Sequence, residues 1–272
     1  MRPSRALPVA LVLAVAVAVA GCGEDANDVL GETARNIGDI RSGQLDMSML
    51  VAGRGADAQG GEVGFELSGP FALPRAGGLP RAEVDYTQQA GEQRATVTLV
   101  STGDAAFVEV GGQAYALPPD QTETLRLGTG QLGSGGARDQ LRIGSWVRDA
   151  EVSDGGTVGG AETDKVSGRL DVATAATDLL RLSRALGPDG AGLRALEQGA
   201  DQLEQATDDS SFELWTGKED RLLRRLQIAV ALGEEDGPKA SVRFGLAVAD
   251  PNEPIRVEAP ENPLPSSALP QG

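Results

Sequence analysis

Segments in which every second residue is apolar recur through most of this chain, and this alternation constrains its fold more than any other feature. A strand with such a pattern has one apolar face, which must be covered. The first six segments follow one another with only turns between them, so they predict an antiparallel meander. They are residues 44–51, 62–68, 83–87, 94–99, 107–110 and 113–117, with Gly111-Gly112 as a two-residue hairpin turn between the last two.

The second half of the chain mixes helical spacing with further alternation. Three amphipathic helices are expected, at residues 29–41 with Asp28 as the N-cap, at 172–186 and at 192–206. Residues 118–164 are less regular and contain one short strand near 149–152. Further strands are expected at 165–170, 212–216, 221–232, 242–248 and 255–257.

These elements predict an α+β fold built on a single large antiparallel sheet. A sheet of about 10–11 strands must curl, and it then has a concave and a convex side. The helices are the amphipathic elements that can cover its apolar concave side. The expected domain spans residues 28–259, and the proline-containing residues 260–272 are expected to be a disordered tail.

The N-terminus has the pattern of a secretory signal. Arg2 and Arg5 precede an apolar run over residues 9–20 that is shorter than the ~18 residues expected of a membrane span. Val19-Ala20-Gly21-Cys22 resembles the bacterial lipobox, and Cys22 is the single cysteine of the chain. We therefore expect a signal peptide at 1–21, acylation of Cys22, a short tether at 22–27, and an anchor of two or more acyl chains on the extracytoplasmic face of the cell membrane. An ordinary secreted protein with an unmodified thiol is the alternative.

Composition excludes several classes of function. The formal charge is −16, without the clusters of Lys and Arg that nucleic acid requires. The chain has no histidine, so no Ser-His-Asp arrangement is possible, and a zinc site would lack its usual ligands. The carboxylates fall in turn-like clusters without the spacing of a calcium loop. We expect no enzyme activity, no metal and no cofactor.

One short motif is ambiguous. Residues 128–133 fit the G-x-G-x-x-G pattern. A dinucleotide fingerprint must follow a strand and open a helix, but Ser134-Gly135-Gly136 comes next and disfavours a helix. We interpret this stretch as a flexible loop.

The order of these features resembles a known family of lipoproteins. The pieces that carry the resemblance are the lipobox, the segment Leu45-Asp46-Met47-Ser48-Met49, the hairpin at 106–117, the run Val166-Ser167-Gly168-Arg169-Leu170-Asp171-Val172, and the closing strands. Together they resemble the LprG/LppX lipoproteins, which belong to the LolA/LolB-like class. The resemblance implies a half-barrel wrapped on helices, with a cavity between them that holds the acyl chains of a lipid.

That resemblance predicts a membrane-anchored lipid carrier or chaperone of the cell envelope. Its implied partners are lipid or lipoglycan acyl chains, the membrane through the anchor, and an export transporter. A non-carrying interaction or sensor module of the same fold is the alternative. The apolar phase of the strands and helices gives these candidate cavity residues: Met47, Met49, Phe65, Leu67, Val84, Val97, Leu99, Leu179, Leu196, Ile228, Val230 and Phe244.

Overall fold

The computed structural model describes residues 25–53, 61–74, 78–133, 142–178, 207–233 and 240–268. The helical elements are α1 (Ala26–Asn36), η1 (Ile37–Asp39), α2 (Pro119–Gly133), η3 (Ile143–Trp146) and η4 (Ser266–Ala268). The strands are β1 (Ser42–Gly53), β2 (Val63–Ala72), β3 (Arg81–Ala90), β4 (Gln93–Thr102), β5 (Ala106–Val110), β6 (Gln113–Ala116), β7 (Val147–Val158), β8 (Ala161–Leu170), β9 (Thr207–Gly217), β10 (Leu223–Leu232), β11 (Ala240–Ala249) and β12 (Leu264–Pro265).

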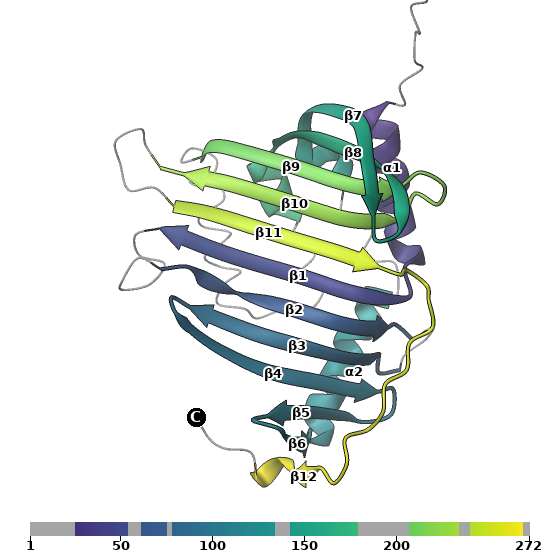
Figure 1. The fold of residues 1–272 in the computed structure, drawn as a ribbon, viewed down its shortest axis with the longest axis vertical. Coiled ribbons are helices and arrows are strands. Elements are labelled where there is room, and N and C mark those ends of the chain that lie inside the picture. Colours follow the sequence, from purple (N-terminus) through teal and green to yellow (C-terminus); the bar gives the residue numbers. More distant parts are fainter. Residues whose placement is uncertain are drawn as a thin grey trace, which may run out of the picture.

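All of these strands belong to one sheet. Its order is β12-β6-β5-β4-β3-β2-β1-β11-β10-β9-β8-β7, and α1 and α2 lie behind it in the view of Figure 1. The pairs are antiparallel except at the edge, where β12 runs parallel to β6. The predicted fold class, a large curled antiparallel sheet over helices, is confirmed.

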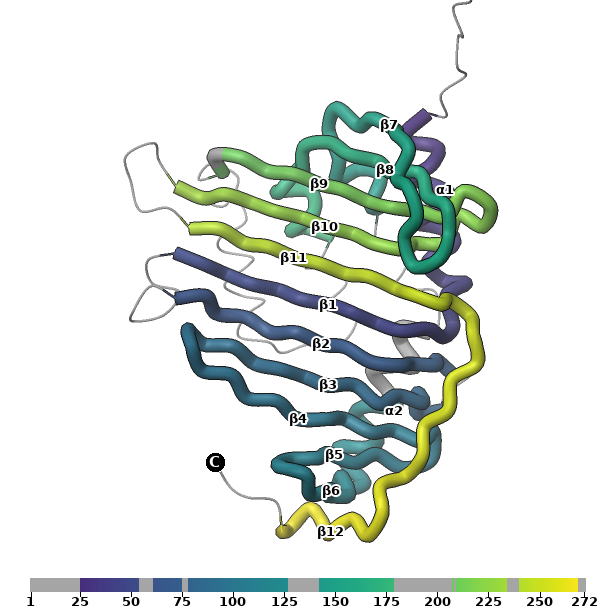
Figure 2. The backbone as a smooth tube through the Cα atoms, in the orientation of Figure 1, coloured from purple at the N-terminus to yellow at the C-terminus, as the bar shows by residue number. Residues whose placement is uncertain are grey.

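The predicted meander is β1 to β6, and β11 returns to pair with the free edge of β1. This return joins the two halves of the chain into a continuous sheet, as the tube in Figure 2 shows. The predicted hairpin between β5 and β6 is also present. Gly111 and Gly112 have φ of 59° and 81°, which suits the two-residue turn that matches strand twist.

The register shows which face of the sheet is apolar. Paired residues of neighbouring strands point to the same side. One row therefore places these residues on a common face: Val152, Val166, Leu214, Leu226, Leu246, Met47, Leu67, Tyr86 and Val97.

That face is the side on which both helices lie. Val29 and Leu30 of α1 join the core cluster that contains Val166. Leu99, two residues from Val97, lines a cavity together with Leu125 of α2. The opposite face carries polar pairs such as Thr87 and Thr96, whose hydroxyls lie 2.8 Å apart.

The first helix begins and ends earlier than predicted. Asp25, not Asp28, is its N-cap, and the Asp25 carboxylate accepts a hydrogen bond from the Asn27 amide at 2.8 Å. Asp28 instead lies in the first turn, where its charge suits the helix dipole. The chain tightens into η1 after Asn36 and enters β1 at Ser42.

The segment 118–164 is more regular than predicted. Residues 128–133 belong to α2, so the prediction of a flexible loop is wrong. Pro119 at the first helical position favours initiation, and a glycine costs only about 1 kcal/mol relative to alanine, so the helix continues. A dinucleotide fingerprint is excluded as well, because these glycines lie far from the start of the helix.

The strands that follow α2 are also longer than predicted. The short strand near 149–152 is part of β7, and the strand at 165–170 begins at Ala161. Gly159 and Gly160, with φ of 57° and 79°, form a second tight turn between them. The prediction missed this hairpin because β7 has too few apolar residues to show a clear alternation of apolar and polar positions.

The C-terminal prediction needs correction too. Residues 255–257 form no strand, and residues 264–268 of the predicted disordered tail form β12 and η4. A two-residue strand has no periodicity that a sequence pattern could reveal. Residues 172–178 begin the helix predicted at 172–186. The rest of that helix, the helix predicted at 192–206, the signal peptide and Cys22 lie outside the described residues.

A candidate lipid-binding cavity

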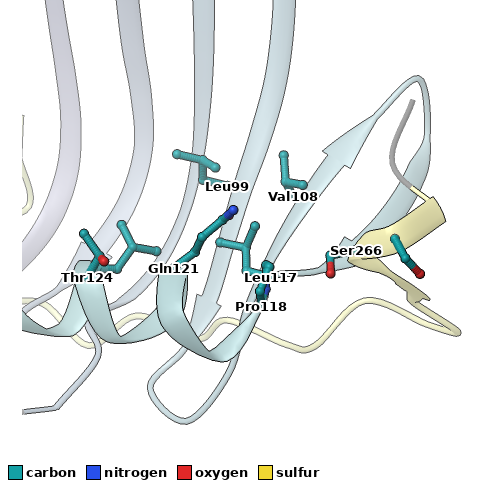
Figure 3. Close-up of a pocket in the computed structure, with 9 residues that line it drawn as sticks. Leu99, Val108, Leu117, Pro118, Gln121, Thr124 and Ser266 are labelled. Atoms are coloured by element: carbon teal, nitrogen blue, oxygen red, sulfur yellow. The ribbon is translucent and has the colours of Figure 1, made fainter. Parts of the chain in front are cut away.

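A cavity of about 680 Å³ lies between the sheet and the start of α2. Its lining residues are Leu99, Val108, Leu117, Pro118, Gln121, Thr124, Leu125, Ser266 and Ser267. In Figure 3, Leu99 and Val108 lie on the sheet side of the cavity, Gln121 and Thr124 lie on the helix, and Ser266 lies on the side opposite Thr124. The volume falls in the range of about 300–1,000 Å³ that is typical of small-molecule sites.

The sequence between β6 and α2 positions this cavity. Pro119 begins the helix, and a residue before a proline, here Pro118, favours an extended backbone. The Leu117 amide donates to the Ala106 carbonyl at 2.9 Å, which holds the turn against β5. The helix therefore starts beside the sheet edge and presents Gln121, Thr124 and Leu125, at i, i+3 and i+4, from one side.

The described lining is mostly apolar and contains no charged side chain. Leu99, Val108 and Leu117 supply aliphatic surface, whereas the polar members carry amide or hydroxyl groups. The charged pair of α2, Glu123 and Arg126, belongs to other positions of the helix. The hydrogen bond from Arg126 lowers the pKa of the Glu123 carboxyl. Within the described residues, no group of His, Cys, Asp or Glu is arranged to hold a metal ion.

All predicted cavity residues within the described part of the chain lie on the apolar face. They separate into two groups along the sheet. Ile228, Val230 and Phe244 belong to or pack against the core under α1. Met49 and Leu99 each keep 38% of their surface exposed, and Met47, Phe65, Leu67 and Val97 are half-buried.

Of the predicted residues that the structure describes, only Leu99 lines the cavity itself. Val84, its partner in the register, is buried beside it. Leu179 and Leu196 lie outside the described residues. Sequence reasoning missed the contributions of α2 and η4, although the spacing of Gln121, Thr124 and Leu125 was a usable helical signal.

The other end of the sheet is closed by α1. Val166, Phe212 and Leu214 are fully buried against it. The Thr33 hydroxyl of α1 lies 2.8 Å from the Val29 carbonyl oxygen and 2.9 Å from the Thr216 hydroxyl oxygen, so its one hydrogen has an acceptor and the buried hydroxyl is satisfied. This end has the dense packing of an ordinary protein interior.

A buried carboxylate fastens the segment beside this core. Asp178 accepts hydrogen bonds from the Trp146 indole at 3.0 Å and from the Arg142 amide at 3.2 Å. Burial alone raises the pKa of Asp178, but these bonds and the Arg142 guanidinium outweigh it and hold the pKa below its ordinary value. Asp178 therefore pins η3 to the helix that begins at residue 172.

Comparisons with known proteins give structural neighbours only. No family model matches the chain, and no curated protein matches it. The chain is similar to LprF from Mycobacterium bovis, with 12% identity and a TM-score of 0.43 over 86% of this chain and 96% of that one. It is also similar to MucB, solved in complex with MucA(peri), with 13% identity and a TM-score of 0.28 over 84% of this chain and 58% of that one.

A third neighbour is a LolA superfamily protein from Nitrosomonas europaea, with 10% identity and a TM-score of 0.21 over 83% of this chain and 94% of that one. Among the described helices, none combines the length and the apolar character needed to cross a bilayer.

Proposed function

We propose that this protein is a membrane-anchored lipoprotein that holds acylated lipid between the β1–β5 part of its sheet and α2, and carries or chaperones it across the cell envelope. The observation that carries the proposal is that side chains on one continuous apolar face are fully buried in one part and partly exposed in another. Val166 and Leu214 are fully buried, whereas Met49 and Leu99 on the same face keep 38% of their surface exposed.

The energetics support an apolar ligand at the open part. Exposed apolar surface is unfavourable in water, and each lipid CH₂ moved from water into an apolar site gains about 0.8 kcal/mol. An acyl chain lying on Leu99, Val108 and Leu117 would remove from water both its own apolar surface and that of these side chains. Because the described lining has no charged side chain, an acyl chain that enters it does not remove a charge of the protein from water.

Native mass spectrometry of residues 23–272, purified without detergent, tests this function. We expect an added mass that organic extraction removes and that analysis of the extract shows to be acylated lipid. Protein that carries no lipid, and takes up none from vesicles, would instead favour a non-carrying interaction or sensor module.

The membrane anchor is a separate part of the proposal and needs its own test. The thiol of Cys22 is the proposed acyl acceptor, so Cys22→Ala should leave the precursor unprocessed and unlipidated. Cells grown with a clickable fatty acid should label the wild-type protein but not this variant. Equal labelling of both proteins would contradict the anchor.

A further inference from the structure

The C-terminal segment contributes two residues to the cavity lining and is held weakly in place. It leaves the sheet after Ala249 and rejoins it at β12, where Leu264 pairs with Tyr115 and Pro265 with Ala116. The next two residues, Ser266 and Ser267, form part of the cavity lining. Figure 1 shows this segment passing along one side of the sheet to the β6 edge.

The start of the segment is tied firmly to the sheet. The Asn252 amide donates to the Ser42 carbonyl at 2.8 Å, and the Asn252 side chain accepts from the Arg41 amide at 2.8 Å. The Ser42 hydroxyl donates to the Glu253 carbonyl at 2.7 Å. Asp250 and Asn252 have positive φ, so the chain bends sharply at this fixed point.

Beyond Glu253 the attachment is slight. No hydrogen bond joins residues 254–263 to any other residue that the structure describes. Pro254, Pro260 and Pro263 restrict the backbone, so this part is stiff although it is not tied down. At its far end, β12 has two residues, and Leu264 keeps 41% of its surface exposed.

We propose that residues 254–268 form a strap that closes the cavity at the β6 edge and swings from the bend at 250–253 to admit ligand. Release of β12 from β6 withdraws Ser266 and Ser267 from the cavity wall and leaves α2 and the sheet edge in place. Local opening of this kind draws on the least stable parts of a fold, and a two-residue strand with an exposed leucine is such a part. The inference rests on the proposed function, because it assumes a ligand that enters this cavity.

A reversible cross-link tests the strap. Residues 23–272 contain no cysteine, so Ala116→Cys with Pro265→Cys introduces the only thiols. These positions are register partners on strands about 4.8 Å apart, within reach of a disulfide. Oxidation should slow the uptake of a fluorescent long-chain fatty acid at least about tenfold, because the disulfide keeps the strap on β6. Reduction should restore the rate. Equal rates in the two states would overturn the strap while leaving the proposed function standing.

A matched control uses the outer face of the sheet. Thr87→Cys with Thr96→Cys also joins register partners, but it ties β3 to β4 and leaves the strap free. Oxidation of this control should leave uptake unchanged, and equal slowing in both variants would overturn the proposal.

Hydrogen exchange separates failure of the strap from failure of the proposed function. If neither the wild type nor the cysteine variants, oxidised or reduced, take up the fatty acid, the proposed function fails and the strap is not a ligand gate. The backbone amides of Leu264, Ser266, Ser267 and Ala268 should in any case exchange faster than those of β1, and protection equal to that of β1 would also overturn the strap.

Discussion

The two ends of this sheet present the same apolar face but fill it differently. Under α1, apolar side chains of β8 and β9 on this face are fully buried: they are Val166, Phe212 and Leu214. Beside α2, Leu99 of β4 lines a cavity of about 680 Å³ and stays partly exposed. The difference teaches that alternation alone determines which side of a strand is apolar, whereas the covering element determines whether that side becomes core or cavity.

The largest expected difference between the ends is in stability. Leu214→Ala truncates a fully buried side chain at the closed end and should lower the free energy of unfolding by about 2–5 kcal/mol. Leu99→Ala is the matched change at the open end, and it should cost less than about 1 kcal/mol because little packing is lost. Denaturant unfolding measures both. Similar losses at the two sites would show that the open end is ordinary core.

An increase in side-chain size should distinguish the ends as well. Val230 belongs to the closed core, so Val230→Trp should overpack it and cost about 1–3 kcal/mol. Thermal unfolding measures the loss. A variant with an unchanged melting temperature would show that the closed end also contains usable space.

Acid should weaken the closed end through Asp178. The pKa of this carboxyl is lowered in the folded state, so its contribution is present above its unfolded pKa of about 3.9 and is lost as the pH falls through the folded pKa. Asp178→Asn should therefore be less stable than the wild type at pH 7, and the difference should shrink on acidification below about pH 4. Urea unfolding at several pH values tests this. A constant difference across that range would contradict the assigned role.

The sequence determines the apolar face well because each strand carries its own signal. The register places Leu67 and Val97 on one face and connects that face to Val230 across the sheet, as the alternation predicted. The cavity was harder to predict, because it is formed where different elements meet. Gln121 comes from a helix that contains glycines, and Ser266 comes from the three-residue η4 that follows a two-residue strand. Neither local pattern shows which distant strand it will contact.

Lipid occupancy of Val97→Trp tests the central claim most directly. Val97 lies on the apolar face beside Leu99, in the half-buried part of the sheet. If an acyl chain lies on this half-buried part of the apolar face, the new indole should take its place. Native mass spectrometry should then show less bound lipid, and the melting temperature should be nearly unchanged. Thr96→Trp is the control on the opposite face and should keep its lipid. A large fall in the melting temperature of Val97→Trp with unchanged lipid content would show closed core and contradict the account.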